Sequence, residues 1–334
     1  MVDSKGILIF GEIRQGLLAS IVTELLGIGQ KLALEIGEKI SVIIIGSDPD
    51  NVLANDAIAF GANEVYIVDN PSLASYKNDS YVEVMEKVCR TLNPRILLFG
   101  HTSIGRDLAP RLAFRLKTGL VTDCTDVTLD PDSHLLVLTR PVYGGNAMAV
   151  LRCGSYYPQM ATVREKAMAP SGRDNSREGE IVHMDVELDS SLLRTEFIER
   201  IEQNIEGVKL EDAEIVVCGG RGIGSADGFK ELEELARILG GAVGATRSPC
   251  ESNWAPSTIQ VGLTGKIVTP KLYIGIALSG SSQHISGCSG SRTIVAINKD
   301  QDANIFNIAH YGIVGDYKKV LPAFKEKCKE ILRY

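Results

Sequence analysis

The chain has 334 residues, 44% of them hydrophobic and 23% charged, which is the composition of a folded globular protein with about two domains. Its net charge of -7 argues against a nucleic-acid-binding surface, because neutralising phosphates takes clustered Lys and Arg. The most apolar helical stretch, residues 17–37, is interrupted by Glu24, Gln30 and Lys31 and falls short of the ~18 apolar residues of a membrane span.

The cysteines and the N-terminus exclude further classes of protein. The seven cysteines are scattered singly, whereas iron–sulfur and structural zinc sites need clustered ligands, so we expect no metal site. The first residues lack the charged region, apolar region and cleavage site of a secretory signal. We therefore expect a cytoplasmic protein with reduced thiols.

The N-terminal part of the chain alternates β-rich runs with helical stretches. The pattern predicts strands at 6–10, 41–47, 64–69 and 95–100 and helices at 17–36, 49–60 and 79–92. This βαβ order predicts a parallel sheet with helices on both faces.

Residues 100–119 place glycine and polar residues between a strand and a helix, where open α/β sheets bind ligands. His101, Thr102, Ser103 and Arg106 are therefore candidate ligand contacts. The alternative is an ordinary capped helix start, in which Asp107 interacts favourably with the helix dipole.

Residues 120–187 contain several β-rich segments separated by glycine and proline turns, with no helix between them. Antiparallel pairing is favoured for such segments, so we expect a mixed sheet that completes an N-terminal α/β domain. A polar, turn-rich stretch and a charged connecting segment follow. We place the domain boundary near 190–208, which gives an N-terminal domain of residues 1–200.

Residues 208–334 form the second predicted domain. Strands are expected at 215–218, 241–245, 272–278, 293–297 and 311–315, with helices at 225–239 and 316–332. The order is again that of a doubly wound parallel sheet. The predicted fold class is therefore α/β with two doubly wound domains.

The glycine cluster after the strand at 215–218 raises the question of a nicotinamide nucleotide. The G-x-G-x-x-G fingerprint has Ser225 at its third glycine position, and Arg247 stands where an acid for the ribose is needed. A P-loop at residues 260–267 fails too, because Gln260 and Ile267 occupy its glycine and Ser/Thr positions.

Four loops remain as candidates, each following a predicted strand at one edge of the second sheet. They are residues 219–225, 244–247, 260–266 and 278–284. Small residues and backbone N–H groups suit a pyrophosphate, while Arg221, Arg247 and His284 offer positive charge or hydrogen bonds to an anionic or electron-rich ring. Ser281 and Ser282 lie near His284 without a neighbouring carboxylate, which disfavours a hydrolase.

These motifs resemble the electron-transfer flavoprotein α-subunit (FixB) family. In the family's order and spacing, its C-terminal FAD domain is matched by "VVCGGRG", "GAVGATR", "QVGLTGK", "LSGSSQH", "IVAINKD" and "YGIVGD". Its N-terminal domain is matched by "GRDLAPRLAFRLKTGLVTDCT", "TRPVYGGN" and "PQMATVRE". The resemblance covers nearly the whole chain.

The resemblance implies an electron carrier without turnover of its own. It implies a heterodimer with a separate β subunit and one FAD held mainly by the C-terminal domain. Such a carrier takes electrons from acyl-CoA dehydrogenases or similar flavoenzymes to a downstream acceptor.

The resemblance also implies roles for individual residues. Arg221 would meet the phosphate and adenosine region, Thr264 would point its hydroxyl at flavin N5, and His284 would lie near the C2 carbonyl. Asn298, Asp316 and Tyr317 would finish the adenine end. The full implied FAD site comprises Arg221, Thr246, Arg247, Gln260, Val261, Gly262, Leu263, Thr264, Ser279, Gly280, Ser281, Ser282, Gln283, His284, Asn298, Asp316 and Tyr317.

Two positions depart from the family pattern. Leu263 stands where the family usually has glutamine, and leucine cannot donate a side-chain hydrogen bond to the ring. Thr246 stands where serine is frequent, which keeps the hydroxyl.

Two other functions are compatible with the sequence. The chain could belong to a complex that bifurcates electrons between an acyl-CoA and ferredoxin, which depends on a second flavin in the partner. It could instead be a nucleotide-binding regulatory module that never cycles a flavin.

Overall fold

The computed structural model describes residues 4–47, 49, 51–145, 147–189, 193–199 and 208–332. The chain divides into two compact units. Met1–Pro141 and Met148–Arg200 make up the first, and Val142–Ala147 and Ile201–Tyr334 make up the second. The proposed domains were 1–200 and 208–334, whereas the second unit begins at Ile201 and also includes Val142–Ala147.

The first unit is built on a seven-stranded sheet with the strand order β12-β5-β4-β1-β6-β11-β7. Every neighbouring pair in it is parallel. The strands are β1 Ile7–Phe10, β4 Ile40–Gly46, β5 Glu64–Asp69, β6 Ile96–Gly100, β7 Leu120–Cys124, β11 Gln159–Val163 and β12 Glu180–His183.

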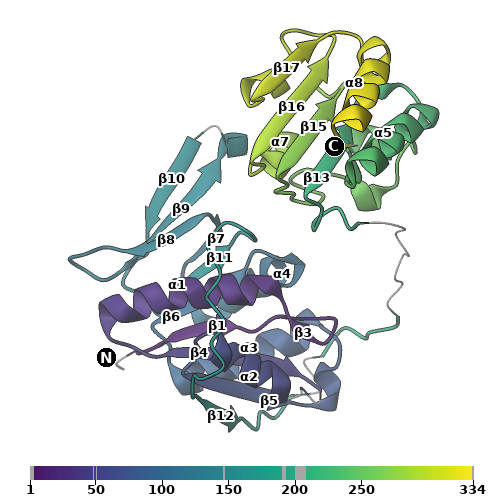
Figure 1. Cartoon of the computed structure of the whole chain (residues 1–334). Coiled ribbons are helices and arrows are strands. Elements are labelled where there is room, and N and C mark those ends of the chain that lie inside the picture. The colour runs from purple at the N-terminus through teal and green to yellow at the C-terminus, as the bar shows by residue number, and fades with distance from the viewer. Residues whose placement is uncertain are drawn as a thin grey trace. The chain divides into compact units, whose positions relative to one another are not determined.

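Helices cover both faces of this sheet, as the βαβ order predicts (Figure 1). α1 Ser20–Ile36 and α2 Asn51–Ala59 bury their apolar residues with Ile7 and Ile9 of β1. α3 Asn78–Leu92 and α4 Ser103–Leu116 pack with Leu8 and Phe10 on the opposite face. Alternate side chains of β1 thus pack into separate hydrophobic cores on the two faces of the sheet, which confirms the doubly wound arrangement.

The pairing expected for residues 120–187 is only partly correct. β8 Asp126–Leu129 and β9 Leu136–Val142 are antiparallel and form a separate three-stranded sheet with β10 Ala147–Arg152. β11 and β12, however, join the parallel sheet. A parallel connection needs a crossover of a dozen or more residues, and here the three-stranded sheet and an irregular segment supply it without a helix.

The second unit has a five-stranded sheet with the order β14-β13-β15-β16-β17, and all its neighbouring strands are parallel. α5 and α8 pack on one face, and α7 packs on the other. The bounds are β13 Ile215–Gly219, α5 Ala226–Leu239, β14 Ala242–Ala245, α6 Arg247–Glu251, β15 Leu272–Ile276, α7 Ser282–Cys288, β16 Thr293–Asn298, β17 Tyr311–Val314 and α8 Tyr317–Leu332.

Several shorter elements complete the chain. The loop after β1 holds a small antiparallel hairpin that the sequence did not predict, β2 Ile13–Arg14 with β3 Leu17–Leu18. The short helices α6 and α7, which were not predicted, begin within the predicted loops 244–247 and 278–284. No helix within the described ranges is both long and apolar enough to cross a membrane.

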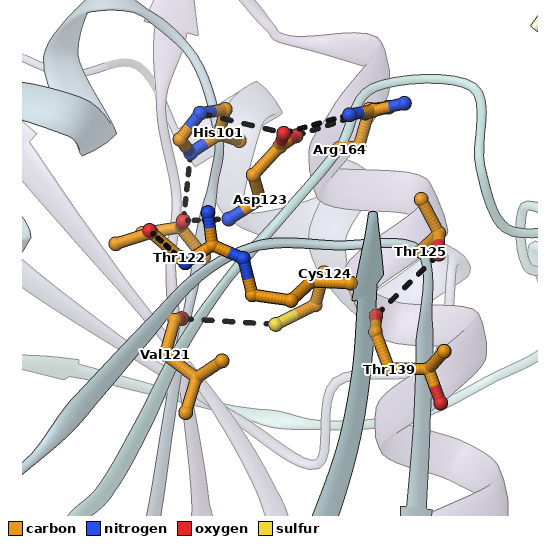
Figure 2. Close-up of polar contacts among 10 residues, drawn as sticks. His101, Val121, Thr122, Asp123, Cys124, Thr125, Thr139 and Arg164 are labelled. Atoms are coloured by element: carbon orange, nitrogen blue, oxygen red, sulfur yellow. Dashed lines mark hydrogen bonds and ion pairs between the residues drawn. The ribbon is translucent and has the colours of Figure 1, made fainter. Parts of the chain in front are cut away.

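A buried ion pair fixes the strand ends where the three-stranded sheet leaves the parallel one. Asp123, near the end of β7, has a left-handed backbone with φ 63°. Arg164, just after β11, donates to both carboxylate oxygens of Asp123, from Nε at 2.8 Å and from Nη2 at 2.7 Å. Figure 2 shows the Asp123 carboxylate between the Arg164 guanidinium and the His101 ring. Both side chains of the ion pair are only 12% exposed.

His101 belongs to this cluster as a structural residue. Its Nδ1 lies 2.8 Å from Thr162 Oγ1, and its Nε2 lies 3.9 Å from Asp123 Oδ1. Burial lowers the pKa of His101 to about 4, so the ring is neutral at pH 7. Thr162 is fully buried, so no substrate can reach its hydroxyl.

The start of α4 has the cap of the structural alternative, but Asp107 lies beyond the first turn and accepts a hydrogen bond from the Tyr76 hydroxyl at 2.9 Å, so its expected contribution to the helix dipole is not found. Thr102 Oγ1 accepts the Gly105 N–H at 3.0 Å, which is an N-cap, and donates to Glu12 Oε2 at 2.5 Å.

We predict that Arg164→Ala lowers the free energy of unfolding by about 3–5 kcal/mol, because it leaves the Asp123 carboxylate buried without its partner. The matched control is Arg173→Ala, which breaks an ion pair with Asp56 in which Arg173 is 52% exposed and should cost less than about 1 kcal/mol. Urea unfolding of both variants measures the difference. An equal decrease in the free energy of unfolding of the two variants would mean that the buried ion pair stabilises the fold no more than the surface pair does.

Candidate functional site

The carboxyl ends of β13, β14, β15 and β16 surround one cavity of about 600 Å³. This edge of an open parallel sheet is where α/β proteins bind ligands, and the volume lies in the range of small-molecule sites. The cavity is lined by Arg221, Gly222, Thr246, Arg247, Ser248, Gln260, Val261, Gly262, Leu263, Thr264, Ala277, Leu278, Ser279, Gly280, Ser281, Gln283, His284, Asn298 and Asp300.

All the predicted site residues except Ser282, Asp316 and Tyr317 line this cavity. Ser282 begins α7, beside the lining residues Ser281 and Gln283. Asp316 Oδ1 accepts the Lys318 N–H at 3.0 Å in the first turn of α8. Tyr317 is buried, and its hydroxyl donates to the Ile223 carbonyl at 2.9 Å, beneath the glycine turn. That these three contact a cofactor stays a prediction.

Two glycines bring the turns after β13 and β15 together. A Cβ on Gly220 would lie 2.3 Å from Leu278 Cα, and one on Gly222 would lie 2.9 Å from Ala277 Cβ. The Gly222 N–H donates to the Ala277 carbonyl at 3.1 Å. Ala277 itself has φ 52°, a conformation that few residues with a Cβ adopt. Gly222, Ala277 and Leu278, which this contact brings together, line the cavity.

The loop at 260–266 is closed by its own hydrogen bonds. Lys266 N–H donates to the Gln260 carbonyl at 2.7 Å, and Gly262 N–H donates to the Lys266 carbonyl at 3.1 Å. Gln260 Nε2 donates to Thr264 Oγ1 at 3.0 Å. An amide nitrogen can only donate, so Thr264 keeps its own hydroxyl hydrogen available for a ligand.

His284 is held by hydrogen bonds on both sides of its ring. Nδ1 lies 3.0 Å from the Val261 carbonyl, which can only accept, so Nδ1 carries the hydrogen. Nε2 then accepts from the Tyr273 hydroxyl at 2.7 Å. Tyr273 is fully buried, and the thiols of Cys218 and Cys288 lie beside its hydroxyl.

Of the positive charge or hydrogen bonds expected from His284, this environment does not favour the positive charge. Burial lowers the pKa of His284 to about 4, although the bond to the Val261 carbonyl acts in the opposite direction. The ring is therefore neutral at pH 7. The free energy of unfolding does not depend on this histidine above pH 6.5, where the ring is neutral in both states. It decreases as the pH falls from 6.5 toward 4, because the unfolded chain binds the proton more tightly than the folded one.

Two arginines are the remaining positive groups among the described lining residues. Arg247 is 69% exposed, and its Nε donates to Glu251 Oε1 at 2.7 Å along α6. Arg221 follows β13 and is exposed on the glycine turn. Both can turn toward an anionic or electron-rich ligand.

The opposite end of the cavity is formed by the loop after β16. Asn298 is buried, and its Nδ2 donates to the Leu278 carbonyl at 2.8 Å while its Oδ1 accepts the Asp300 N–H at 3.0 Å. Its side chain thus joins the loops after β15 and β16. Asp300 lies beside it on the cavity wall.

Five described lining residues are not among those named for the predicted FAD site, although Gly222 and Leu278 lie within the predicted loops 219–225 and 278–284. Gly222 and Ser248 adjoin predicted residues and could have been included from the loop positions alone. Ala277 and Leu278 sit at a strand end that was predicted two residues too long. Asp300 follows the strand at 293–298, and its place at the carboxyl edge was the available signal.

Comparison with known proteins follows the same division of the chain. Residues 7–189 match the family described as "Electron transfer flavoprotein domain", and residues 209–289 match "Electron transfer flavoprotein FAD-binding domain". The chain belongs to the electron transfer flavoprotein family. The resemblance inferred from the sequence motifs is confirmed.

Relatives match along nearly the whole chain. The electron transfer flavoprotein subunit alpha of Thermoanaerobacterium thermosaccharolyticum is 46% identical, over 99% of this chain and 100% of the relative. The subunit alpha of Megasphaera elsdenii is 44% identical, over 99% and 98%. The acryloyl-CoA reductase electron transfer subunit beta of Anaerotignum propionicum is 36% identical, over 98% and 96%.

Family membership assigns this chain a role in electron transfer as an α-type subunit that binds a flavin. An α subunit implies a β-subunit partner and a redox partner.

We predict that Tyr273→Phe lowers the free energy of unfolding by about 1–3 kcal/mol, because it leaves the buried His284 Nε2 without a hydrogen-bond donor. Tyr311→Phe is the matched control, since Tyr311 is 67% exposed on the edge strand β17 and should change stability by less than about 0.5 kcal/mol. Denaturant unfolding of the two variants tests this. If Tyr273→Phe is as stable as the control, the hydroxyl does not hold the ring.

Proposed function

We propose that the chain binds one FAD in the cavity of its second unit and carries electrons as a heterodimer with a β subunit. Its redox partners on this proposal are acyl-CoA dehydrogenase-type flavoenzymes and a downstream acceptor. The observation that supports it most is the cavity on the carboxyl edge of the second sheet, whose described lining gathers small residues, two arginines and one carboxylate from loops far apart in the sequence.

The lining residues fit a flavin dinucleotide. Arg221 and the serines at 279 and 281 can bind phosphate oxygens near the middle of the cavity, where the glycine turn gives the backbone close access. Neighbouring strands are ~4.8 Å apart, so loops on four neighbouring strands can follow an extended ligand for about 14 Å.

The ring of the flavin belongs, on this proposal, at the β14 end. Thr246, Arg247 and the loop at 260–264 form that end of the cavity. Bound FAD supplies the redox chemistry, and the protein supplies position and electrostatics. Thr264 would donate its hydroxyl hydrogen to flavin N5, and Arg247 would place positive charge near the ring.

Leu263 is expected to make the ring environment less polar than in relatives with glutamine. Leu263 is 48% exposed on the cavity wall, and its N–H donates to the Gln283 carbonyl at 2.8 Å. This hydrogen bond holds the backbone of residue 263 in place. The expected difference from relatives with glutamine is therefore that the leucine side chain offers a ligand no hydrogen bond.

The choice of an acyl-CoA enzyme as redox partner is supported by a relative's name. The relative from Anaerotignum propionicum is named as the electron transfer subunit of an acryloyl-CoA reductase. The contrasting function from the sequence, a nucleotide-binding regulatory module that never cycles a flavin, runs against the flavin-binding domain of the family. A visible spectrum of the chain purified with its β partner separates the two, because only a carrier is yellow.

We predict that Arg221→Ala weakens FAD binding by about ten- to a hundredfold, the effect of losing a charge-assisted bond to phosphate. Arg237→Ala is the matched control, because Arg237 lies in the last turn of α5 and outside the cavity. Quenching of flavin fluorescence measures both. An equal affinity in the two variants would remove Arg221 from the site.

We predict that Arg247→Ala lowers the midpoint potential for the first electron by about 20–60 mV, because an exposed cation favours the added negative charge by roughly 0.5–1.5 kcal/mol. Glu251→Gln should shift the potential the other way, since it removes the carboxylate that partly neutralises Arg247. Spectroelectrochemical titration measures both shifts. An unchanged potential in both variants would mean that Arg247 does not lie close to the flavin ring.

A further inference from the structure

A second cavity, of about 590 Å³, lies in the first unit. Its lining includes Phe10 at the end of β1, Gly46 at the end of β4 and Ser75 in the connection between β5 and α3. All the described residues that line it belong to the first unit, so it is separate from the cavity at the ends of β13 to β16. The function proposed above does not use it.

The cavity lies where the helices of the two sheet faces diverge. α1 and α2 follow β1 and β4 on one face of the sheet, and α3 and α4 follow β5 and β6 on the other. Leu53 of α2 and Ile104 of α4 both line the cavity. Open α/β sheets bind ligands outside the carboxyl ends of the strands where the strand order reverses, and β1, between β4 and β6, is that point in this sheet.

The hairpin of β2 and β3 adds a wall to the cavity. It is inserted between β1 and α1, and Ile13, Gln15 and Gly16 from it line the cavity. Gln15 and Gly16 make its turn with φ of 53° and 77°. A direct connection from β1 to α1 would leave this side of the cavity open.

Three polar side chains in the lining are not used by the fold. Gln15, Ser47 and Ser75 line the cavity, and their side chains make no hydrogen bond to any residue that the structure describes. The Tyr76 hydroxyl, in contrast, donates to Asp107 Oδ2 at 2.9 Å. One amide and two hydroxyl groups can therefore donate to a ligand and accept from it.

The lining offers a ligand no net charge. The described residues that line the cavity include no lysine, arginine or histidine. Their one carboxylate, Glu12, is 3% exposed and already accepts hydrogen bonds from Arg14 Nε at 2.8 Å and from the Thr102 hydroxyl. A phosphate group would therefore find no cation to pair with, unlike in the second unit, where two arginines line the cavity. An uncharged ligand is favoured.

The inner wall is aromatic and the rim is polar. Phe10 and Tyr81 are buried, and the Tyr81 ring packs edge-on against Tyr76 with 4.9 Å between the ring centroids. Gln15 and Ser47 are exposed. A flat ring suits the inner wall, and hydroxyl groups suit the rim.

We propose that this cavity of the first unit binds an uncharged nucleoside, with its base against the aromatic side chains and its sugar hydroxyls at the polar rim. The inference does not depend on the flavin of the second unit, because the two cavities share no residue.

The test is equilibrium dialysis of the full chain with its β partner against radiolabelled adenosine, and against AMP as its charged counterpart. Gly46→Val fills the cavity at little cost to the fold, because a Cβ at Gly46 would have Ile13 Cδ1 as its nearest listed neighbour, at 3.8 Å. Gly119→Val is the matched control, since Gly119 is exposed, lies outside the cavity and has open space around an added Cβ.

We expect Gly46→Val to weaken adenosine binding by about tenfold or more, because the valine methyl groups occupy the space of the ligand. Gly119→Val should bind adenosine as the wild type does. Ser47→Leu fills the cavity from an exposed position and should weaken binding in the same way, which keeps the test valid if Gly46→Val does not fold. The binding that these variants remove should favour adenosine over AMP.

Three results would overturn the inference. A wild-type complex that binds no adenosine contradicts the site itself. Adenosine binding that neither Gly46→Val nor Ser47→Leu weakens belongs to another part of the complex. Binding that these variants remove, but that favours AMP, contradicts the preference for an uncharged ligand.

Discussion

The cavity of the second unit depends on the close contact between the backbone turns after β13 and β15. Gly220 and Gly222 lie against Ala277 and Leu278 so tightly that a Cβ at position 220 would come within 2.3 Å of a main-chain carbon. Because β13 and β15 are neighbours in the sheet, this contact sets how the loops after them face each other. Arg221 on one turn and Ser279 on the other reach the same cavity as a result. A larger residue at 220 would push apart the two loops that carry the groups suited to phosphate.

The cavity carries less positive charge than its residue types suggest, because its histidine is neutral at pH 7. His284 is the residue most easily taken for a cation, yet its ring is buried between Val261 and Tyr273 and is neutral. Positive charge therefore comes from arginines at the rim and negative charge from Asp300 alone among the described lining residues. The buried histidine contributes shape and a fixed hydrogen-bond pattern, which respond to pH only under acidic conditions.

Much of this organisation could be predicted from the sequence, because it follows from local periodicity. The βαβ order, the doubly wound units and the glycine loops of the second unit are all local patterns. Pairing between distant segments could not be predicted in the same way. Nothing near Gln159 shows that its strand lies beside Ile96 in a parallel sheet, since the usual helical crossover is missing. The protonation of His284 depends chiefly on its burial, and the buried position beside Val261 and Tyr273 is created only by the fold.

The all-parallel sheet of the first unit has a consequence for how the chain folds. Its edge strand β12 pairs with β5, Glu180 opposite Glu64, and β11 pairs with β6, Gln159 opposite Ile96. β5 and β6 are therefore synthesised long before the strands that pair with them. Long-range parallel pairing is slow, because the entropy of closing a long loop is lost before the pairing energy is gained. During translation the edges of β5 and β6 stay open until residues 159–183 have left the ribosome. Until then the nascent chain exposes unpaired strand edges to other chains.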